Sequence, residues 1–260
     1  MSLKNKLRYY KFKIFRFLKI LGVHKIWRFF LKLAWYKTKN ENILLSKYNA
    51  LYFPISKIAN SSIKAIIAKI LDIELANPDK NAIHDKESSI HRTIFPSIDI
   101  KNKENINKLY KFWFVRNPYD RLVSCYINRI QKDKIFTENF INWVPRNFLL
   151  LWNFKAGMSF EEFVKEICKI PDSKADSHFR SQYTFLVDKE GELITDFIGK
   201  FENLSEDWNI ICKKLWIHWF ELPHLMKSNH KNYREYYNKE LKNMVRKRYK
   251  KDLDLFKYEF

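Results

Sequence analysis

Short apolar runs alternate with segments of helical spacing over most of the chain. The run Asn49 to Pro54 predicts a buried strand, and Lys111 to Val115 predicts a second one. Each is followed by an amphipathic stretch, Ser61 to Leu71 and Pro118 to Ile130. The second stretch has proline in its first turn, where a helix tolerates it. We therefore expect two strand–helix units in the first half of the chain.

The same alternation continues in the second half. Residues 159–168 predict a helix that begins with the Ser-x-x-Glu spacing of a capping box. Thr195 to Phe201 predicts a third strand, and Ser205 to Leu215 and Lys239 to Phe256 predict two further helices. Strands that alternate with helices predict an α/β domain, with a central, mostly parallel sheet covered by helices on both faces.

The first 39 residues have a different pattern. They carry twelve Lys and Arg residues and no Asp or Glu, interleaved with aromatic and aliphatic residues on either side of Gly22. Two basic amphipathic helices fit this pattern, and such helices lie in the lipid headgroup layer with their lysines on anionic lipid. A helical hairpin packed on the domain, with a solvated basic rim, is the alternative. We expect residues 1–39 to form a basic arm and residues 40–260 to form the domain.

The net charge of +20 lies largely in this arm. Residues 40–260 hold 37 Lys and Arg (49 less the 12 of the arm) against all 29 Asp and Glu, a surplus of only +8. The excess of positive charge predicts a polyanionic partner, which is a nucleic acid, an anionic lipid, an anionic cofactor or a polysaccharide. Global disorder is excluded, because hydrophobic residues make up 46% of the chain and aromatic residues 17%.

Membrane spans and metal centres are not predicted. No stretch approaches the ~18 uncharged apolar residues that a span requires, and Lys or Arg recurs every two to six residues through position 32, unlike a secretory signal. We expect a chain that is neither exported nor anchored by a spanning helix. Cys125, Cys168 and Cys212 form no CxxC or Cys/His cluster. Reduced, mostly buried thiols and no metal site are the expectation.

The stretch YFPISKIANSSIKAII, residues 52–67, reads as a strand end, a tight loop and a helix, yet it has no glycine. This arrangement presents backbone N–H groups and the positive end of a helix to an anion. Lys57 supplies a positive charge, and Ser61 and Ser62 supply hydroxyls in the first helical turn. A Walker loop is absent, because Lys57 lies four residues before Ser61 and not directly before a hydroxyl residue. A plain strand-to-helix connection is the alternative for this loop on its own.

The stretch KFWFVRNPYDRLVSCYINRI, residues 111–130, offers a second anion site. Arg116 ends the predicted strand, and Ser124 follows about two helical turns later, ~12 Å of rise. An arginine at the helix entrance and a hydroxyl on its inner face can hold one phosphate from two sides. Arg121 is either a second phosphate contact or a structural ion-pair partner.

Together, these stretches resemble the sulfotransferases that use 3′-phosphoadenosine 5′-phosphosulfate (PAPS), in their carbohydrate-modifying branch. SKIANSSIK resembles the family's 5′-phosphosulfate-binding loop, with Ser56 in place of proline and Asn60 in place of Ser or Cys. FVRNPYDRLVS resembles its 3′-phosphate-binding element, with Asn117 in place of the usual acid. HFRSQYTFL (178–186), DFIGKFENLSEDW (196–208) and YKKDLDLFKYEF (249–260) resemble further segments, so the resemblance covers about residues 48–260.

The resemblance implies a P-loop NTPase-like three-layer domain, PAPS as co-substrate and no metal. It implies that Arg116 and Ser124 hold the 3′-phosphate and that Lys57 also neutralises the departing 5′-phosphate. The residues that it implies for the 5′-phosphosulfate end are Lys57, Ala59, Asn60, Ser61, Ser62 and Lys64.

A base must take the proton of the acceptor hydroxyl, and an imidazole with its ordinary pKa of ~6.5 suits that task. Carbohydrate sulfotransferases commonly place this histidine between the two motifs, which leaves His84 and His91. We favour His91, because an apolar run follows it, with His84 close behind; a surface position is the alternative for either. His178 lies in a matching segment and either lines the cleft towards the substrate or makes a structural hydrogen bond.

We predict transfer of a sulfuryl group from PAPS to a hydroxyl of a carbohydrate acceptor, a cell-surface glycan or its lipid-linked precursor. Abundant Lys, Asn and Ile suggest an AT-rich genome, and we expect a bacterial source and a cytoplasmic protein, peripheral on the inner face of the cytoplasmic membrane through residues 1–39. No nucleic-acid partner is expected, and the oligomeric state is open. The rival functions are a non-enzymatic polyanion- or membrane-binding module and a nucleotide-dependent kinase, which the missing Walker spacing disfavours.

Overall fold

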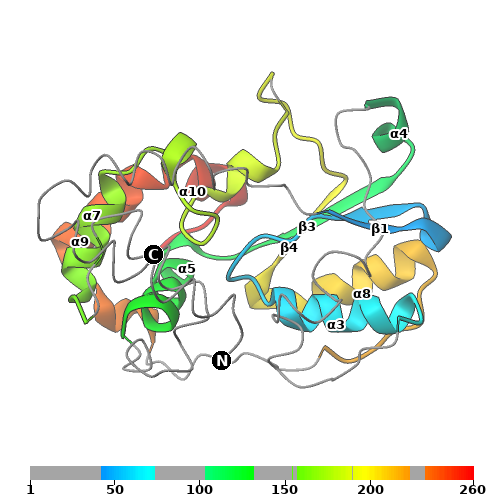
Figure 1. Cartoon of the computed structure of the whole chain (residues 1–260), viewed down its shortest axis with the longest axis horizontal. Coiled ribbons are helices and arrows are strands. Elements are labelled where there is room, and N and C mark those ends of the chain that lie inside the picture. The colour runs from blue at the N-terminus through cyan, green and yellow to red at the C-terminus, as the bar shows by residue number, and fades with distance from the viewer. Residues whose placement is uncertain (1–41, 74–102, 132–153, 155–156, 189, 223–231) are drawn as a thin grey trace, which may run out of the picture. The chain divides into compact units, whose positions relative to one another are not determined.

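The structure is a computed structural model, and it describes residues 42–73, 103–131, 154, 157–188, 190–222 and 232–260 (Figure 1). The chain divides into two compact units. The larger unit is Asn40–Ser124 with Pro171–Phe260, and the described part of the smaller unit comes from Cys125–Ile170. The basic arm, residues 1–39, lies outside the described residues, so its helices and its boundary with the domain stay predictions.

A four-stranded sheet forms the centre of the larger unit. Its strands β1 (Ile43–Leu45), β2 (Ala50–Tyr52), β3 (Tyr110–Val115) and β4 (Phe197–Lys200) lie in sequence order across the sheet. β2, β3 and β4 are parallel neighbours, whereas β1 pairs antiparallel with β2. The predicted α/β class is therefore confirmed with a mixed sheet, and the finer P-loop-like three-layer arrangement stays a prediction.

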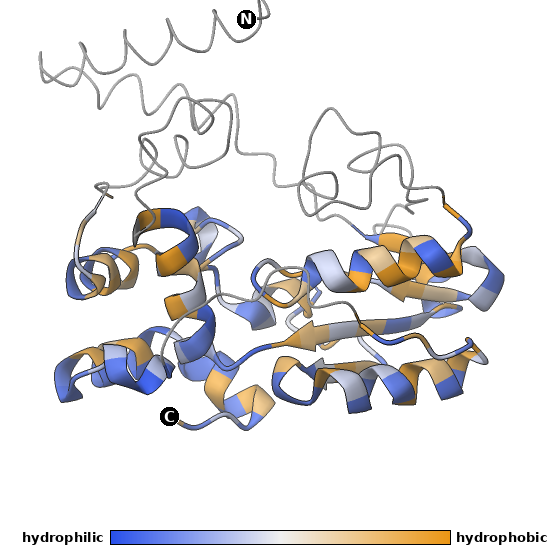
Figure 2. Ribbon diagram, turned by 90° about the horizontal axis from the view of Figure 1, so that it is seen from below, coloured by the Kyte–Doolittle hydropathy of each residue, from blue (hydrophilic) through white to orange (hydrophobic). Residues whose placement is uncertain are grey.

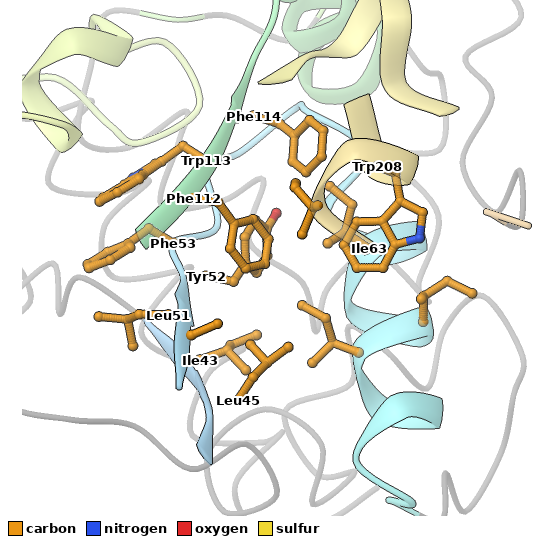
Figure 3. Packing of buried hydrophobic residues seen from close by; sticks show 14 of the residues in the cluster. Ile43, Leu45, Leu51, Tyr52, Phe53, Ile63, Phe112, Trp113, Phe114 and Trp208 are labelled. Atoms are coloured by element: carbon orange, nitrogen blue, oxygen red, sulfur yellow. The ribbon is translucent and has the colours of Figure 1, made fainter. Parts of the chain in front are cut away.

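One face of the sheet is covered by the helices α3 (Asn60–Ile70) and α8 (Leu204–Leu215). Figure 2 shows polar and apolar residues alternating along these helices, as expected where one side of a helix is buried. In Figure 3, Ile63 of α3 and Trp208 of α8 lie on the same side of the strands as Phe112. Trp208, Ile211, Cys212 and Leu215 are the buried residues of α8, at the i, i+3, i+4, i+7 spacing of an amphipathic helix.

The other face of the sheet carries a stacked pair of rings. Phe53 and Trp113 lie face to face with ring centroids 4.0 Å apart, and both are buried. They point away from α3 and α8, on the far side of β3 (Figure 3). Because consecutive side chains of β3 point to opposite faces, its near-continuous apolar run is the pattern of a strand buried on both sides.

The remaining helices lie where helices were predicted, with shifts at their ends, except for the first of them, for which no helix was predicted. They are α4 (Lys103–Asn107), α5 (Pro118–Tyr126), α7 (Phe160–Cys168), α9 (Lys239–Arg248) and α10 (Lys250–Phe256). The single helix predicted for 239–256 is interrupted at Tyr249, which is buried. Short 3-10 turns occupy Ser46–Tyr48, Asp172–Lys174, Gln182–Phe185, Phe201–Asn203 and Tyr233–Tyr236.

The smaller unit contains the end of α5 and α7. A π-helical segment, Ile127–Gln131, follows α5, where a regular helix to Ile130 was predicted. The predicted capping box of α7 is present: the Ser159 hydroxyl accepts the Glu162 N–H, and the Glu162 carboxylate accepts the Ser159 N–H. No described helix is long and apolar enough to cross a membrane.

Gly199 of β4 lies in close contact with both β3 and α8. A Cβ at this position would lie 2.5 Å from the Phe114 ring and 3.1 Å from Cβ of Asp207. The Asp207 carboxylate also accepts the Lys200 N–H at 2.6 Å, so it cannot withdraw without losing that bond. Position 199 thus requires glycine for packing reasons.

We predict that Gly199→Ala lowers the free energy of unfolding by about 1–3 kcal/mol, the cost of overpacking a filled core. Urea unfolding followed by tryptophan fluorescence measures it. The exposed Ser205→Ala on α8 serves as control and should change stability little. Phe114→Leu in the Gly199→Ala background should recover part of the loss; an unchanged unfolding midpoint for Gly199→Ala would contradict the packing argument.

Candidate functional site

The two predicted anion-binding loops leave the same edge of the sheet. The first follows β2 and the second follows β3, and these strands are parallel neighbours with Tyr52 opposite Phe112. The carboxyl ends of parallel strands are where open α/β sheets bind their ligands. The loop before α3 and the loop before α5 therefore begin side by side.

The glycine-free loop takes left-handed backbone conformations with ordinary residues. Lys57 has φ of +73° and Ala59 has φ of +45°. Each such residue costs about 1–3 kcal/mol, and such strain concentrates at ligand-binding sites. Ala59 is the N-cap of α3 and has no side-chain acceptor, so its side chain does not cap the N–H groups of the first turn. The loop thus adopts, without glycine, the left-handed conformations for which phosphate loops often use glycine, and it leads directly into the N-terminus of α3.

A hydrogen bond from strand β2 anchors the first residue of α3. The Tyr52 hydroxyl donates to Oδ1 of Asn60 at 2.7 Å, and burial raises the pKa of Tyr52, which keeps this hydroxyl protonated as a donor. Ser61 and Ser62 are buried in the first turn, and Lys64 lies half-buried one turn further on. Asn60 therefore anchors the helix start, which explains how an amide serves at a position where the family usually has Ser or Cys.

Arg116 joins the two loops directly. Its Nη1 donates to the carbonyl of Lys57 at 3.2 Å, and its Nε donates to Asp120 at 2.8 Å. The guanidinium lies over the ring of Phe201, 4.1 Å from the centroid. Nη2 makes no hydrogen bond within the described part of the chain, so it can donate to a phosphate oxygen. Arg116 is thus oriented on three sides before any ligand binds.

Asn117 caps α5, and Ser124 lies further along the same helix. Oδ1 of Asn117 accepts the Tyr119 N–H at 3.0 Å, while its Nδ2 donates to the carbonyl of Glu259 at 2.7 Å. A carboxylate could make the cap but not this donation, which explains the amide where the family usually has an acid. Ser124 is buried on α5, eight residues after Arg116, and its place beside the 3′-phosphate stays a prediction from that spacing.

Arg121 has the structural role that was one of its two predicted roles. It is almost fully buried and donates to three backbone carbonyls: Ser56 at 3.1 Å, Ser177 at 2.7 Å and Arg180 at 2.8 Å. Ser56 belongs to the phosphosulfate loop, whereas Ser177 and Arg180 belong to a turn more than a hundred residues later. A buried guanidinium needs such partners, and here they hold the two segments together.

Gln182 and Asp252 are important residues for which no role was predicted from the sequence. The Gln182 amide pairs with the backbone of Arg116 in both directions, at 2.9 and 2.8 Å. The fully buried Asp252 carboxylate accepts the N–H groups of Gln182 and Tyr183, both at 2.8 Å. The only sequence signal was that both residues match family segments. Gln182 lies 66 residues from Arg116 and 70 residues from Asp252, and no local sequence pattern encodes contacts over such separations.

His178 is described, whereas His84 and His91 lie outside the described residues. The Nδ1 atom of His178 bonds to the carboxylate of Asp176, which also accepts the His178 backbone N–H at 2.9 Å. The Asp176 carboxylate as a partner was not predicted, although the Asp-x-His spacing is visible in the sequence. In the described part of the chain, no group of three or more His, Cys, Asp or Glu is placed to hold a metal ion.

The sequence profile of the sulfotransferase family matches residues 41–259, which is most of the chain. The chain belongs to the sulfotransferase family. Its match spans both anion-binding loops, the His178 turn and the α9–α10 segment, so the network around Arg116 lies wholly within the region typical of a sulfotransferase.

Similar proteins carry the names of carbohydrate sulfotransferases. The chain is 25% identical over 186 residues to carbohydrate sulfotransferase 14 of Danio rerio, covering 69% of this chain and 49% of that protein. It is 24% identical over 190 residues to the Homo sapiens protein of the same name (68% and 47%) and 22% identical over 240 residues to carbohydrate sulfotransferase 10 of Xenopus laevis (82% and 66%). The chain spans about half the length of the first two of these proteins. No solved structure matches the chain significantly.

Asp252 gives the site a pH-dependent stability. Burial raises its pKa to about 6, against the lowering effect of the Tyr183 and Gln182 N–H groups and of Arg121. The unfolded pKa of an aspartate is ~3.9, so between about pH 4 and 6 the folded state holds the proton that the unfolded state releases. The contribution of Asp252 to stability is therefore greatest below pH 4 and declines as the pH rises to about 6.

We predict that the stability of the wild type relative to Asp252→Asn is about 2 kcal/mol greater at pH 4.5 than at pH 7, because asparagine does not titrate. Urea unfolding of both proteins at the two pH values measures this difference, in which other titrating groups cancel. A difference that is the same at both pH values, or larger at pH 7, would contradict the raised pKa.

Proposed function

We propose that the protein transfers a sulfuryl group from PAPS to a hydroxyl group of a carbohydrate. The observation that carries this proposal is the bond from Arg116 to the Lys57 carbonyl, which joins the two anion-binding loops of a chain that belongs to the sulfotransferase family. One nucleotide with phosphates at its 5′ and 3′ positions requires two such loops side by side.

The residues present fit this donor. The N-terminus of α3, with Lys57, Ser61, Ser62 and Lys64, suits the 5′-phosphosulfate end. Nη2 of Arg116 and the hydroxyl of Ser124 suit the 3′-phosphate. PAPS would supply the sulfuryl group, and these residues of the chain would hold its two anionic ends.

The chemistry asked of the loop is charge stabilisation. As the sulfuryl group departs, negative charge grows on the oxygen of the 5′-phosphate, and fixed N–H groups and a lysine stabilise it most when they are oriented beforehand. The strained conformations of Lys57 and Ala59 and the anchoring of Asn60 provide this orientation. The acceptor proton must pass to a base, for which His84 or His91 was predicted from the sequence.

A carbohydrate acceptor is supported by the names of the similar proteins, carbohydrate sulfotransferases 14 and 10. The proposed acceptor is a cell-surface glycan or its lipid-linked precursor. We place the protein in the cytoplasm of a bacterium, peripheral on the inner face of the cytoplasmic membrane, with residues 1–39 on anionic lipid beside such an acceptor. The twelve basic and absent acidic residues of this arm support the placement.

We predict that Lys57→Ala lowers the rate of ³⁵S transfer from labelled PAPS to the best acceptor of a desulfated polysaccharide panel by at least about 10²-fold. Alanine already takes the left-handed conformation at position 59, so the loop should keep its fold. Lys213→Ala, exposed at the end of α8, is the matched control and should transfer normally. Equal activity of both variants would favour the rival polyanion-binding module, which needs no ordered loop.

A separate prediction concerns the arm. Replacing its twelve Lys and Arg residues by Gln in the full chain should abolish sedimentation with phosphatidylcholine vesicles that contain phosphatidylglycerol, since each basic residue near such a surface contributes about 1 kcal/mol. Replacing Lys247, Lys250 and Lys251, exposed on α9 and α10, is the control for basic charge elsewhere. Unchanged vesicle binding of the arm variant would mean that the arm packs on the domain.

A further inference from the structure

The turn that carries His178 is fixed against the phosphosulfate loop. Arg121 donates to the carbonyl of Ser56 in the loop and to the carbonyl of Ser177 in the turn, at 3.1 and 2.7 Å. The hydroxyls of Ser56 and Ser177 are themselves 3.2 Å apart. Ser56 immediately precedes Lys57, and Ser177 immediately precedes His178. The imidazole is therefore carried on a segment that is in contact with the donor loop.

The turn is also rigid. The carbonyl of Asp176 accepts the N–H groups of Phe179 and Arg180 at 3.0 and 2.7 Å, and the Arg180 guanidinium donates back to the carbonyl of Ala175. The Tyr249 hydroxyl donates to the carbonyl of Phe179 at 2.6 Å. A side chain on such a turn is held in position before the substrate arrives, as an acid–base group must be.

The carboxylate of Asp176 decides how the ring carries its proton. A carboxylate only accepts hydrogen bonds, so Nδ1 of His178 is the donor in this pair and the neutral ring has its lone pair on Nε2. The same carboxylate stabilises the imidazolium that forms when Nε2 takes a proton. The side chains of His178 and Asp176 are 16% and 24% exposed, so both are partly desolvated.

We propose that His178, oriented by Asp176, is the general base of the sulfuryl transfer, an inference that rests on the function proposed above. Nε2 accepts the proton of the acceptor hydroxyl as its oxygen forms the new S–O bond. The bond from sulfur to the 5′-phosphate oxygen breaks, and its electron pair leaves with the phosphate beside Lys57. Among the described residues, Asp176 bonds to the ring itself, and Arg121 and Arg180 donate to backbone carbonyls of the same turn.

This proposal differs from the sequence-based prediction of His84 or His91. Two histidines, His178 and His218, lie in the described part of the chain; His218 is exposed after the end of α8 and bonds to neither anion-binding loop in any described contact. His178 alone of these two is tied to the loop through Arg121.

The test is a set of full-chain variants assayed for ³⁵S transfer from labelled PAPS, both to the best acceptor of a desulfated polysaccharide panel and to water. His178→Ala should lower kcat by about 10²–10⁴-fold, the usual contribution of a general base. Calorimetric binding of 3′-phosphoadenosine 5′-phosphate should be unchanged in this variant, and added imidazole should restore part of kcat. Asp176→Asn should lower kcat by a smaller factor, again without loss of nucleotide binding.

His218→Ala is the matched control and should keep most of kcat. His84→Ala and His91→Ala test the rival bases, and a loss of kcat by about 10²-fold or more in either of them, with unchanged nucleotide binding, would contradict the proposal. The proposal is overturned if His178→Ala keeps a normal kcat, or if its kcat falls only together with nucleotide binding and imidazole restores nothing. In both cases the wild type still binds the nucleotide and transfers sulfate, so the proposed function survives. Failure of the wild type to bind the nucleotide would instead overturn the proposed function, and this inference with it.

Discussion

The site depends on the hydrogen bonds that the guanidinium of Arg121 donates to three backbone carbonyls. Arg121 is buried, and its three carbonyl partners come from the phosphosulfate loop and from the turn around His178, 121 residues apart at Ser56 and Ser177. Removing it would leave three partly buried carbonyls without these donors, and a desolvated acceptor left without a donor costs more than the bond itself contributes. The segment that holds the donor and the segment that carries the proposed base are thus joined by this side chain, together with the contact between the Ser56 and Ser177 hydroxyls.

A second set of bonds holds Arg116 in the same manner. Asp252 fixes Gln182, and Gln182 pairs with the backbone of Arg116, so the C-terminal helix α10 orients a residue at the end of β3. Glu202 adds to this by accepting the Asn117 N–H and the Tyr258 hydroxyl, both within 2.8 Å. The strain of the left-handed Lys57 and Ala59 is offset by these fixed surroundings, as strained ligand loops require.

Much of the secondary structure and several site residues could be predicted from the sequence, because local patterns or motifs carry them. The periodicity of α3 and α8, the alternation of β3 and the capping box of α7 are local patterns, and they were predicted. The three-residue strand β1 is too short for its pattern to be distinguished from a loop. The break at Tyr249, whose hydroxyl donates to the carbonyl of Phe179, was also not predicted. Lys57, Arg116 and Ser124 were named because a motif carries them. Gln182, Asp252 and Asp176 act through partners that are set by the fold, so their roles became visible only in three dimensions.

The central claim is that the loops after β2 and β3 form one site for a nucleotide phosphorylated at both ends. Calorimetric titration of the full chain with 3′-phosphoadenosine 5′-phosphate and with adenosine 5′-phosphate tests it most directly. The account predicts one site per chain and a weaker affinity for adenosine 5′-phosphate by about 10-fold or more, since a charge-assisted hydrogen bond to Arg116 contributes about 1.5–3 kcal/mol. No binding of the doubly phosphorylated nucleotide at millimolar concentration, or equal affinity for the two nucleotides, would contradict it.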